Sequence, residues 1–216
     1  MSSFGSRALA VACWLCGLAI LVLGAWLVCY APNCAANATD AKIIEWFSRE
    51  HNAAADQLFR AVTWLGSVVV LMPLVIASGV ALALHRRIRE AYFLAVALAG
   101  TIVIMHTSKL LVARPRPNDI DALIAMPWDQ SFPSAHTAQI VSVMLAGLMI
   151  IYRLNPIWFN SLWPVALITV VLVALSRIYL QVHYLSDVLV GATVGVLWVC
   201  GLALLVLHQT KERQKE

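Results

Sequence analysis

The chain has 216 residues, of which 62% are hydrophobic and only 12% carry a formal charge, and its mean hydropathy is +0.83. Soluble domains carry charges on about a quarter of their residues, so this composition excludes an ordinary soluble protein and indicates an integral membrane protein. The net charge of +4 needs no nucleic-acid partner, because basic residues beside apolar segments and one basic cluster account for most of it.

Six apolar segments are each long enough to cross a bilayer as a helix, which takes about 20 residues. They occupy residues 8–30, 62–84, 91–113, 134–152, 158–175 and 185–207. The first is longer than the apolar core of a secretory signal, roughly 7 to 15 residues, so we expect an uncleaved anchor. The sequence therefore predicts an all-α, polytopic membrane protein with six transmembrane helices, forming a single domain over residues 1–216.

The connection after the first span, residues 31–57, has the spacing of an amphipathic helix. Asp40 is a candidate N-cap, and the apolar residues that recur at helical spacing are Ile43, Ile44, Phe47, Ala54, Ala55 and Leu58. We expect an interfacial helix in this first outward loop, with Trp46 near headgroup depth. Two roles stay open for it, a cap over the bundle and a part in lipid access.

The distribution of lysine and arginine predicts that both termini lie in the cytoplasm. The basic residues that then flank the spans on the cytoplasmic side are Arg7, Arg86, Arg87, Arg89, Arg153, Lys211, Arg213 and Lys215. In an inner (cytoplasmic) membrane, this orientation directs the loops 31–57 and 115–133 to the periplasm or its equivalent. Cys29 and Cys34 lie on this oxidising side, and we predict a disulfide between them.

Ionisable residues gather in three stretches at the outward ends of the spans: 109–117 (KLLVARPRP), 133–136 (PSAH) and 176–187 (SRIYLQVHYLSD). Charged groups at membrane depth cost about 3 kcal/mol or more each unless they face a polar cavity. Lys109, Arg116 and Arg177 supply positive charge and donors suited to phosphoryl oxygens. Ser134 opens the fourth span as an N-cap, where free backbone N–H groups form an anion site beside His136. The three stretches therefore predict a phosphate site.

His183 and Asp187 are four residues apart, which predicts that they share one helical face. A carboxylate bonded to one ring nitrogen fixes the tautomer and leaves the other nitrogen free to attack phosphorus. The sequence has neither the residue spacing of a metal cage nor a glycine-rich nucleotide loop. The acidic residues of the 115–133 connection are expected in a solvated loop, and they are Asp119, Asp121 and Asp129.

Together, Lys-x6-Arg-Pro (109–117), Pro-Ser-x-His (133–136) and Ser-Arg-x5-His-x3-Asp (176–187) resemble the three signature motifs of the type 2 phosphatidic acid phosphatase superfamily, the lipid phosphate phosphatases. The resemblance implies a six-span membrane fold and a reaction through a phosphohistidine on His183, without a metal or other cofactor. It also implies that Asp187 orients His183 and that His136 protonates the leaving oxygen. The residues that it assigns to the phosphoryl group are Lys109, Arg116, Ser134, Ala135 through its N–H, and Arg177.

Two details of the motifs carry expectations of their own. The family usually has glycine where this chain has Ala135, so the local φ must be one that alanine tolerates. Of the two arginines in the first motif, the spacing from Lys109 selects Arg116, and Arg114 is expected at the rim of the site.

A lipid phosphatase is the leading hypothesis, with a membrane lipid phosphate and the bilayer as partners and the site facing outward. The candidate substrates, in order, are undecaprenyl diphosphate, phosphatidylglycerol phosphate and phosphatidic acid. The alternative is a phosphotransferase that passes the phosphate to an acceptor lipid such as lipid A. A non-catalytic transporter or structural protein is a remote second alternative, and the sequence makes no prediction of an oligomeric state.

Overall fold

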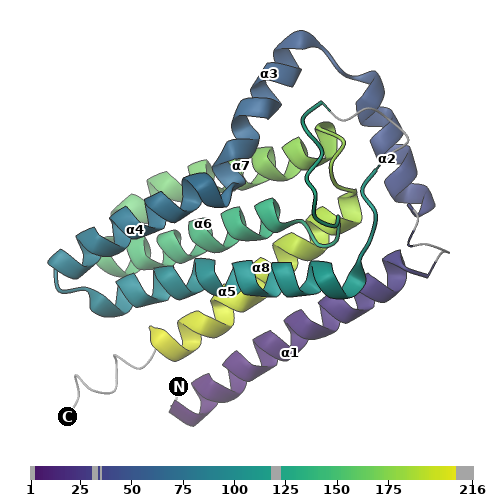
Figure 1. The fold of residues 1–216 in the computed structure, drawn as a ribbon. Coiled ribbons are helices and arrows are strands. Elements are labelled where there is room, and N and C mark those ends of the chain that lie inside the picture. The colour runs from purple at the N-terminus through teal and green to yellow at the C-terminus, as the bar shows by residue number, and fades with distance from the viewer. Residues whose placement is uncertain (1–2, 31–33, 35, 118–122, 208–216) are drawn as a thin grey trace.

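The computed structural model describes residues 3–30, 34, 36–117 and 123–207. Every regular element in these ranges is a helix (Figure 1). In chain order, the helices are α1 (Ser3–Val28), α2 (Ala38–Arg49), α3 (Ala53–Val62), the 3-10 helix η2 (Thr63–Gly66), α4 (Val68–Leu84), α5 (Ile88–Val112), α6 (Ala135–Leu154), α7 (Pro156–Tyr179) and α8 (Leu185–Val206). The residues of the sequence predictions that lie outside these ranges are Asp119, Asp121, Lys211, Arg213 and Lys215.

Among the described residues, five helices are long and apolar enough to cross a membrane: α1, α5, α6, α7 and α8. The prediction of one continuous span at 62–84 is wrong, because the pair Ala53–Gly66 and Val68–Leu84 is bent by 46°. Ser67 leaves the helical conformation, with a ψ of 141°, and its side chain accepts a hydrogen bond from Val69 N, so α4 begins anew there. Taken as one broken span, the pair raises the number of candidate spans to six, and the chain is a multi-pass membrane protein.

The connection after the first span holds two helices rather than the expected one. α2 and α3 form an inverted V beyond one end of the bundle (Figure 1). Asn37 caps α2 by accepting a hydrogen bond from Asp40 N at 2.8 Å, and Asn52 caps α3 by accepting one from Ala55 N at 3.0 Å. The prediction of Asp40 as the N-cap is therefore wrong. Asparagine caps a helix as well as aspartate does, which leaves the buried Asp40 carboxylate to bind groups outside its own helix.

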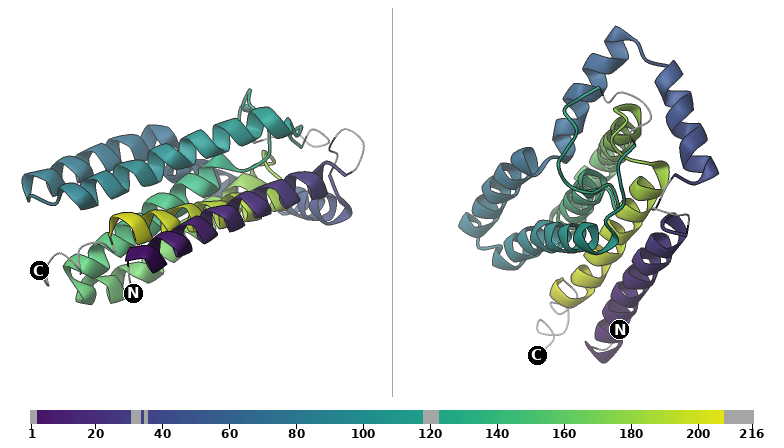
Figure 2. Two further views of the ribbon diagram at one scale, coloured as in Figure 1. Left: turned by 90° about the horizontal axis from the view of Figure 1, so that it is seen from below. Right: turned by 45° about the vertical axis from the view of Figure 1, so that its right-hand side comes forward.

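α6 lies at the centre of the bundle and contacts α4, α5, α7 and α8, whereas α1 lies at the edge and packs along α8 (Figure 2). The side chains that fill the interior with at most 1% exposure include Leu71, Phe93, Ala97, Ile140, Ala146, Val173 and Val199. Lipid tails are as apolar as these side chains, so close packing rather than burial from water holds the helices together.

The starts of α6 and α8 are in backbone contact. A Cβ atom at Gly191 would lie 2.6 Å from Ser134 O, and one at Gly195 would lie 2.9 Å from Ala138 O, so only glycine permits this approach. At the outward side of Gly191, Ser134 N donates a hydrogen bond to Asp187 O at 3.0 Å. This contact brings the second and third motifs side by side.

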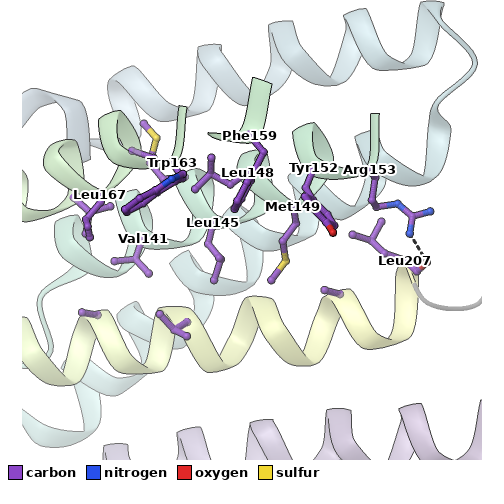
Figure 3. A pocket seen from close by; sticks show the side chains of 16 residues that line it. Val141, Leu145, Leu148, Met149, Tyr152, Arg153, Phe159, Trp163, Leu167 and Leu207 are labelled. Carbon is purple, nitrogen blue, oxygen red and sulfur yellow. Dashed lines mark hydrogen bonds between the residues drawn. The ribbon is translucent and has the colours of Figure 1, made fainter. Parts of the chain in front are cut away.

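A groove of about 900 Å³ is lined by α6, α7 and α8 (Figure 3). Nearly all of its side chains are apolar, among them Leu145, Met149 and Trp163, and Arg153 at one end donates to Leu207 O at 2.9 Å. None of the lining residues belongs to the three motifs. The groove is therefore lined by apolar side chains, and the three motifs lie elsewhere, at the end of the bundle where α5 and α7 end.

Candidate active site

The three motifs meet where α5 and α7 end and α6 and α8 begin (Figure 1). The C-cap of α5 is Ala113, which has a left-handed φ of 50° and donates its N–H to Lys109 O. Two prolines follow and exclude any continuation of the helix. The chain leaves α5 in this irregular form, and Arg114 and Arg116 consequently reach different partners.

His183 lies in the connection between α7 and α8, so the prediction that it shares a helical face with Asp187 is wrong. The two side chains still meet, with His183 Nδ1 3.4 Å from Asp187 Oδ2. Asp187 is the third residue of α8, and its Oδ2 accepts a hydrogen bond from Tyr184 N at 3.0 Å, which closes a capping box. The cap of α8, rather than helical periodicity, holds the carboxylate beside the imidazole.

Ser131 is a further partner of this pair that sequence reasoning missed. Its buried hydroxyl donates to Asp187 Oδ2 and lies 3.4 Å from His183 Nδ1. Its backbone N donates to Arg114 O at 2.9 Å, which fixes its position. The one signal in the sequence is its place two residues before Pro133, and nothing there indicates that the hydroxyl turns toward α8.

The second ring nitrogen of His183, Nε2, faces the basic residues. Arg116 Nη1 lies 3.2 Å from Nε2 and also donates to Val182 O at 2.6 Å. A guanidinium has only donors, so Nε2 is the acceptor and the ring hydrogen is assigned to Nδ1, on the side of Asp187. The lone pair of His183 therefore points toward Arg116.

The surroundings of His183 disfavour its protonated form. Burial is the largest cause that lowers its pKa well below the ordinary 6.5, followed by the charges of Arg116, Lys109 and Arg177 and then by His136. These four residues come from all three motifs, so the fold brings side chains of each motif within electrostatic reach of one imidazole. At neutral pH, His183 is uncharged.

Lys109 and Arg116 share one carboxylate, that of Asp129. Asp129 Oδ2 lies 3.2 Å from Lys109 Nζ, and its Oδ1 lies 2.5 Å from Arg116 Nη2. Asp129 lies in a loop as expected, with 31% of its side chain exposed, but its carboxylate is held by two cations. Burial alone would raise the pKa of Asp129, but the charges of Lys109 and Arg116 outweigh it and lower that pKa.

The described part of the chain contains no group of three or more His, Cys, Asp or Glu residues placed to hold a metal ion.

Arg177 is buried in the last turn of α7 and donates through Nη1 to Thr63 Oγ1. Its Nε has no hydrogen-bond partner among the described residues.

At the start of α6, Ser134 is the N-cap, and its Oγ lies 3.0 Å from Thr137 Oγ1. Ala135 is the first helical residue and has no positive φ, so the expectation of a φ that alanine tolerates is confirmed.

His136 is half-buried in the first turn of α6, close to the bend between η2 and α4. A Cβ atom at Gly66 would lie 3.0 Å from His136 O and 3.2 Å from His136 Cβ. The absence of a side chain at Gly66 lets η2 close against the start of α6. The break in the second span thus forms one wall of the site.

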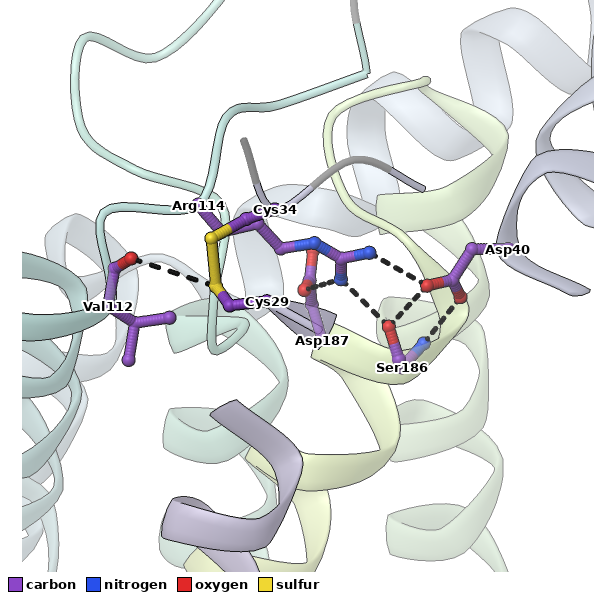
Figure 4. Close-up of a disulfide and its surroundings, with 7 residues drawn as sticks. All are labelled: Cys29, Cys34, Asp40, Val112, Arg114, Ser186 and Asp187. Carbon is purple, nitrogen blue, oxygen red and sulfur yellow. Dashed lines mark hydrogen bonds and ion pairs between the residues drawn. A yellow bond between two sulfur atoms is a disulfide. The ribbon is translucent and has the colours of Figure 1, made fainter. Parts of the chain in front are cut away.

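Arg114 is fully buried, so its expected place at the rim is wrong (Figure 4). Its Nη1 donates to Asp187 Oδ1 at 2.6 Å and to Ser186 Oγ at 2.8 Å, and its Nη2 donates to Asp40 Oδ2 at 2.9 Å. The guanidinium carbon lies 4.1 Å from the centroid of the Tyr184 ring. Asp40 also accepts a hydrogen bond from Ser186 N at 3.0 Å, which docks α2 onto the start of α8. Arg114 thus holds one Asp187 oxygen while the other faces the imidazole.

The predicted disulfide between Cys29 and Cys34 is confirmed (Figure 4). Cys29 Sγ lies 4.0 Å from Val112 O, at the last residue of α5. The disulfide therefore joins the end of α1 to the segment before α2, beside the point where α5 leads into Arg114.

Residues 90–213 match the PAP2 superfamily. The undecaprenyl-diphosphatase of Sulfolobus acidocaldarius is 34% identical over 115 residues, which are 51% of this chain and 52% of that protein. Phosphatidylglycerophosphatase B of Bacillus subtilis is 25% identical over 145 residues, 66% of this chain and 70% of that protein. The decaprenylphosphoryl-5-phosphoribose phosphatase of Mycobacterium tuberculosis is 39% identical over 128 residues, 56% and 64% of the two chains. The chain thus spans between 52% and 70% of the length of these relatives.

Two solved structures share the fold. A PAP2-type phosphatidylglycerolphosphate phosphatase from Bacillus subtilis superposes with a TM-score of 0.74 and 22% identity, over 96% of this chain and 97% of that chain. LpxE of Aquifex aeolicus superposes with a TM-score of 0.62 and 25% identity, over 78% and 96% of the two chains. Because the first superposition covers nearly the whole chain, the helices before residue 90 belong to the same fold as the matched segment.

Proposed function

The chain belongs to the PAP2 superfamily, and we propose that it is an integral membrane lipid phosphatase that removes the terminal phosphate from a lipid phosphate or diphosphate. The observation that carries the proposal is the position of the buried His183, whose Nε2 faces Arg116 while its Nδ1 faces Asp187. Its lowered pKa, caused mainly by burial, favours the neutral ring that this arrangement needs. The names of the relatives support the class, since each is a phosphatase of a lipid-linked phosphate.

His183 acts as the nucleophile. Its Nε2 lone pair attacks phosphorus, the bond from phosphorus to the leaving oxygen breaks, and a phosphohistidine forms. Positive charge develops on the ring as Nε2 becomes bonded. Asp187 stabilises that charge and, with Ser131, keeps the hydrogen on Nδ1, where both side chains lie.

Lys109, Arg116 and Arg177 hold the phosphoryl oxygens. Phosphoryl transfer is catalysed mainly by positioning and by stabilisation of charge, which these three cations provide. The Nε of Arg177, a buried donor with no partner among the described residues, is available to a phosphoryl oxygen. Ser134 and the N–H of Ala135 add the anion site of a helix start.

His136 serves the two half-reactions in opposite directions. In the first step it gives a proton to the leaving oxygen, and in the second it takes one from the water that hydrolyses the phosphohistidine. Because three cations already supply the charge that a metal ion would bring, the reaction proceeds without a metal.

The orientation proposed for the enzyme follows the basic residues at the ends of the spans. Both termini lie in the cytoplasm, the protein sits in the inner membrane, and the site faces the periplasm. Undecaprenyl diphosphate, phosphatidylglycerol phosphate and phosphatidic acid, in that order, are the substrates to try. The first two correspond to the names of two relatives.

The test is phosphate release by the purified protein in detergent from a panel of these lipids, with and without EDTA. We expect release from at least one lipid, unchanged by EDTA and abolished in a His183→Ala variant. Release from none of them, or activity lost in EDTA and restored by Mg²⁺, would contradict the proposal. Analysis of the lipid products with an acceptor such as lipid A present distinguishes transfer to the acceptor from hydrolysis.

A further inference from the structure

We infer that the Asp129 carboxylate competes with phosphate for Lys109 and Arg116, and thereby sets how tightly the site holds free phosphate. The inference rests on the proposed function in one respect, the assignment of these two cations to the phosphoryl group. It adds a residue to the site that belongs to none of the three motifs.

The carboxylate binds the two cations as two oxygens of a phosphoryl group would. One oxygen lies 3.2 Å from Lys109 Nζ, and the other lies 2.5 Å from Arg116 Nη2. The cationic side chains are nearly enclosed, with 4% and 8% of their surfaces exposed, whereas 31% of the Asp129 side chain is exposed. Asp129 therefore reaches the cations from the side that is open, where an incoming phosphate also has to approach.

The loop that carries Asp129 is anchored without its carboxylate. Arg116 Nε donates to the backbone oxygen of Asp129 at 2.8 Å, and Lys109 Nζ donates to the backbone oxygen of Gln130. Ser131 N donates to Arg114 O at 2.9 Å. These contacts use main-chain atoms on the loop side, so the Asp129 side chain can rotate away while the backbone stays in place.

The competition has a consequence for turnover. The single negative charge of the carboxylate offsets part of the positive charge of two enclosed cations, and an uncompensated charge in such a place is unfavourable. As inorganic phosphate leaves, Asp129 takes its place, which favours release of the product. Every anion that binds there must displace the same carboxylate, so the competition weakens the binding of all of them by the same factor.

The experiment measures the affinity of the full-length protein in detergent for inorganic phosphate by titration calorimetry. In Asp129→Asn and Asp129→Ala, we expect phosphate to bind about tenfold more tightly. Phosphate then no longer has to displace a charge-assisted hydrogen bond, which contributes a free energy of about this size. Asp129→Glu, which keeps the charge, should stay near the wild type. The matched control is Glu45→Gln, which removes one negative charge from an exposed residue of α2 that pairs only with the exposed Arg49 among the described residues, and it should leave phosphate affinity unchanged.

Unchanged or weaker phosphate binding in the Asn and Ala variants would overturn the inference. Failure of both variants to fold would overturn it too, because the carboxylate would then be needed to hold the loop. Failure of the proposed function gives a different result: the wild-type protein would bind no phosphate, or Arg177→Met would bind it as tightly as the wild type.

Discussion

Two arginines of one motif, Arg114 and Arg116, lie in two different ion-pair groups. The Arg114 network consists of Arg114, Asp187 and Asp40, and the exposure of these three side chains does not exceed 2%. The Arg116 cluster consists of Arg116, Lys109 and Asp129, and it is open at Asp129. The same kinds of side chain, two residues apart, therefore form a buried support in one group and, in our proposal, an exchangeable anion site in the other.

Burial explains the difference. In the enclosed Arg114 network, loss of one partner leaves a charge that water cannot reach, so the pairs persist as part of the fold. In the Arg116 cluster, a partly exposed carboxylate can give way to another anion at little cost in stability. The network holds Asp187 beside His183 on one side, and on the other side lies the cluster that we propose binds the phosphate.

The largest effect is expected where the two groups meet, at His183. His183→Ala should remove both the phosphoenzyme and turnover, whereas His136→Ala should lower turnover by roughly two to four orders of magnitude for each proton-transfer role. With an aryl phosphate, whose leaving group needs little protonation, His136→Ala should still form the phosphoenzyme and then stall. The measurement uses a substrate with a labelled phosphate, quenches the reaction without acid, and counts the label bound to the protein. Label on His136 in the His183→Ala protein would refute the assignment.

The next prediction separates the two arginines by stability. Arg114→Met leaves Asp187 and Asp40 buried without their cation and should lower the free energy of unfolding by about 3–5 kcal/mol. Arg116→Met frees a carboxylate that water already reaches and removes hydrogen bonds to the backbone oxygens of Asp129 and Val182. It should cost about 1–2 kcal/mol, less than Arg114→Met, while phosphate binding weakens. Denaturant unfolding in detergent provides the comparison. Equal losses in the two variants would contradict the division into a support and an exchange site.

The disulfide lies on the side of the Arg114 network. A crosslink at a sequence separation of 5 lowers the conformational entropy of the unfolded chain, which stabilises the folded protein by about 2 kcal/mol. The double variant Cys29→Ser, Cys34→Ser should show a loss of about that size, with phosphate affinity unchanged because the Arg116 cluster is not touched. If stability stayed the same and phosphate affinity fell, the disulfide would act on the cluster instead.

The pH dependence of activity tests the charge around His183. Its lowered pKa keeps the imidazole neutral as pH falls through 6.5, so the acid limb of kcat/KM should lie well below pH 6.5 once the ionisation of the substrate is taken into account. The sign for stability agrees: the contribution of the neutral ring is complete above the unfolded pKa of about 6.5 and is lost as pH falls from there through the folded pKa. If the acid limb lay at or above pH 6.5 in the wild type and disappeared in Arg116→Met, the Arg116 cluster would raise the pKa of His183 instead of lowering it.

The smallest effect concerns Ala113, whose left-handed φ of 50° turns the chain out of α5 ahead of the two arginines. Glycine adopts this conformation without strain, so Ala113→Gly should stabilise the protein by about 1 kcal/mol. Ala77→Gly, in the middle of α4, is a control in which the same change should be destabilising. A destabilised Ala113→Gly would mean that the methyl group contributes packing that outweighs the strain.

The sequence predicted the spans, the disulfide and the residues that surround His183, because each depends on a local pattern or on a spaced motif. It did not predict the break at Ser67, since a serine within an apolar run carries no mark of the helix cap that it forms. Nor did it place Arg114, Ser131 and Asp129, whose roles depend on partners 13 to 74 positions away. The alternation of two arginines with two prolines in the first motif is compatible with side chains that point different ways, but the burial that tells them apart is a property of the assembled fold.

Gly191 touches no phosphate, carries no charge and lies two turns into α8, yet a methyl group there would come closer to Ser134 O than real Cβ atoms approach another atom. The start of α6 would have to move away from α8. Ser134, the N-cap of α6, would then separate from Asp187 in the first turn of α8. In a mutational scan that scores activity alone, Gly191 would therefore be indistinguishable from a residue of the reaction itself. Only an inter-residue distance measured between the two helix starts would reveal that it acts as a spacer.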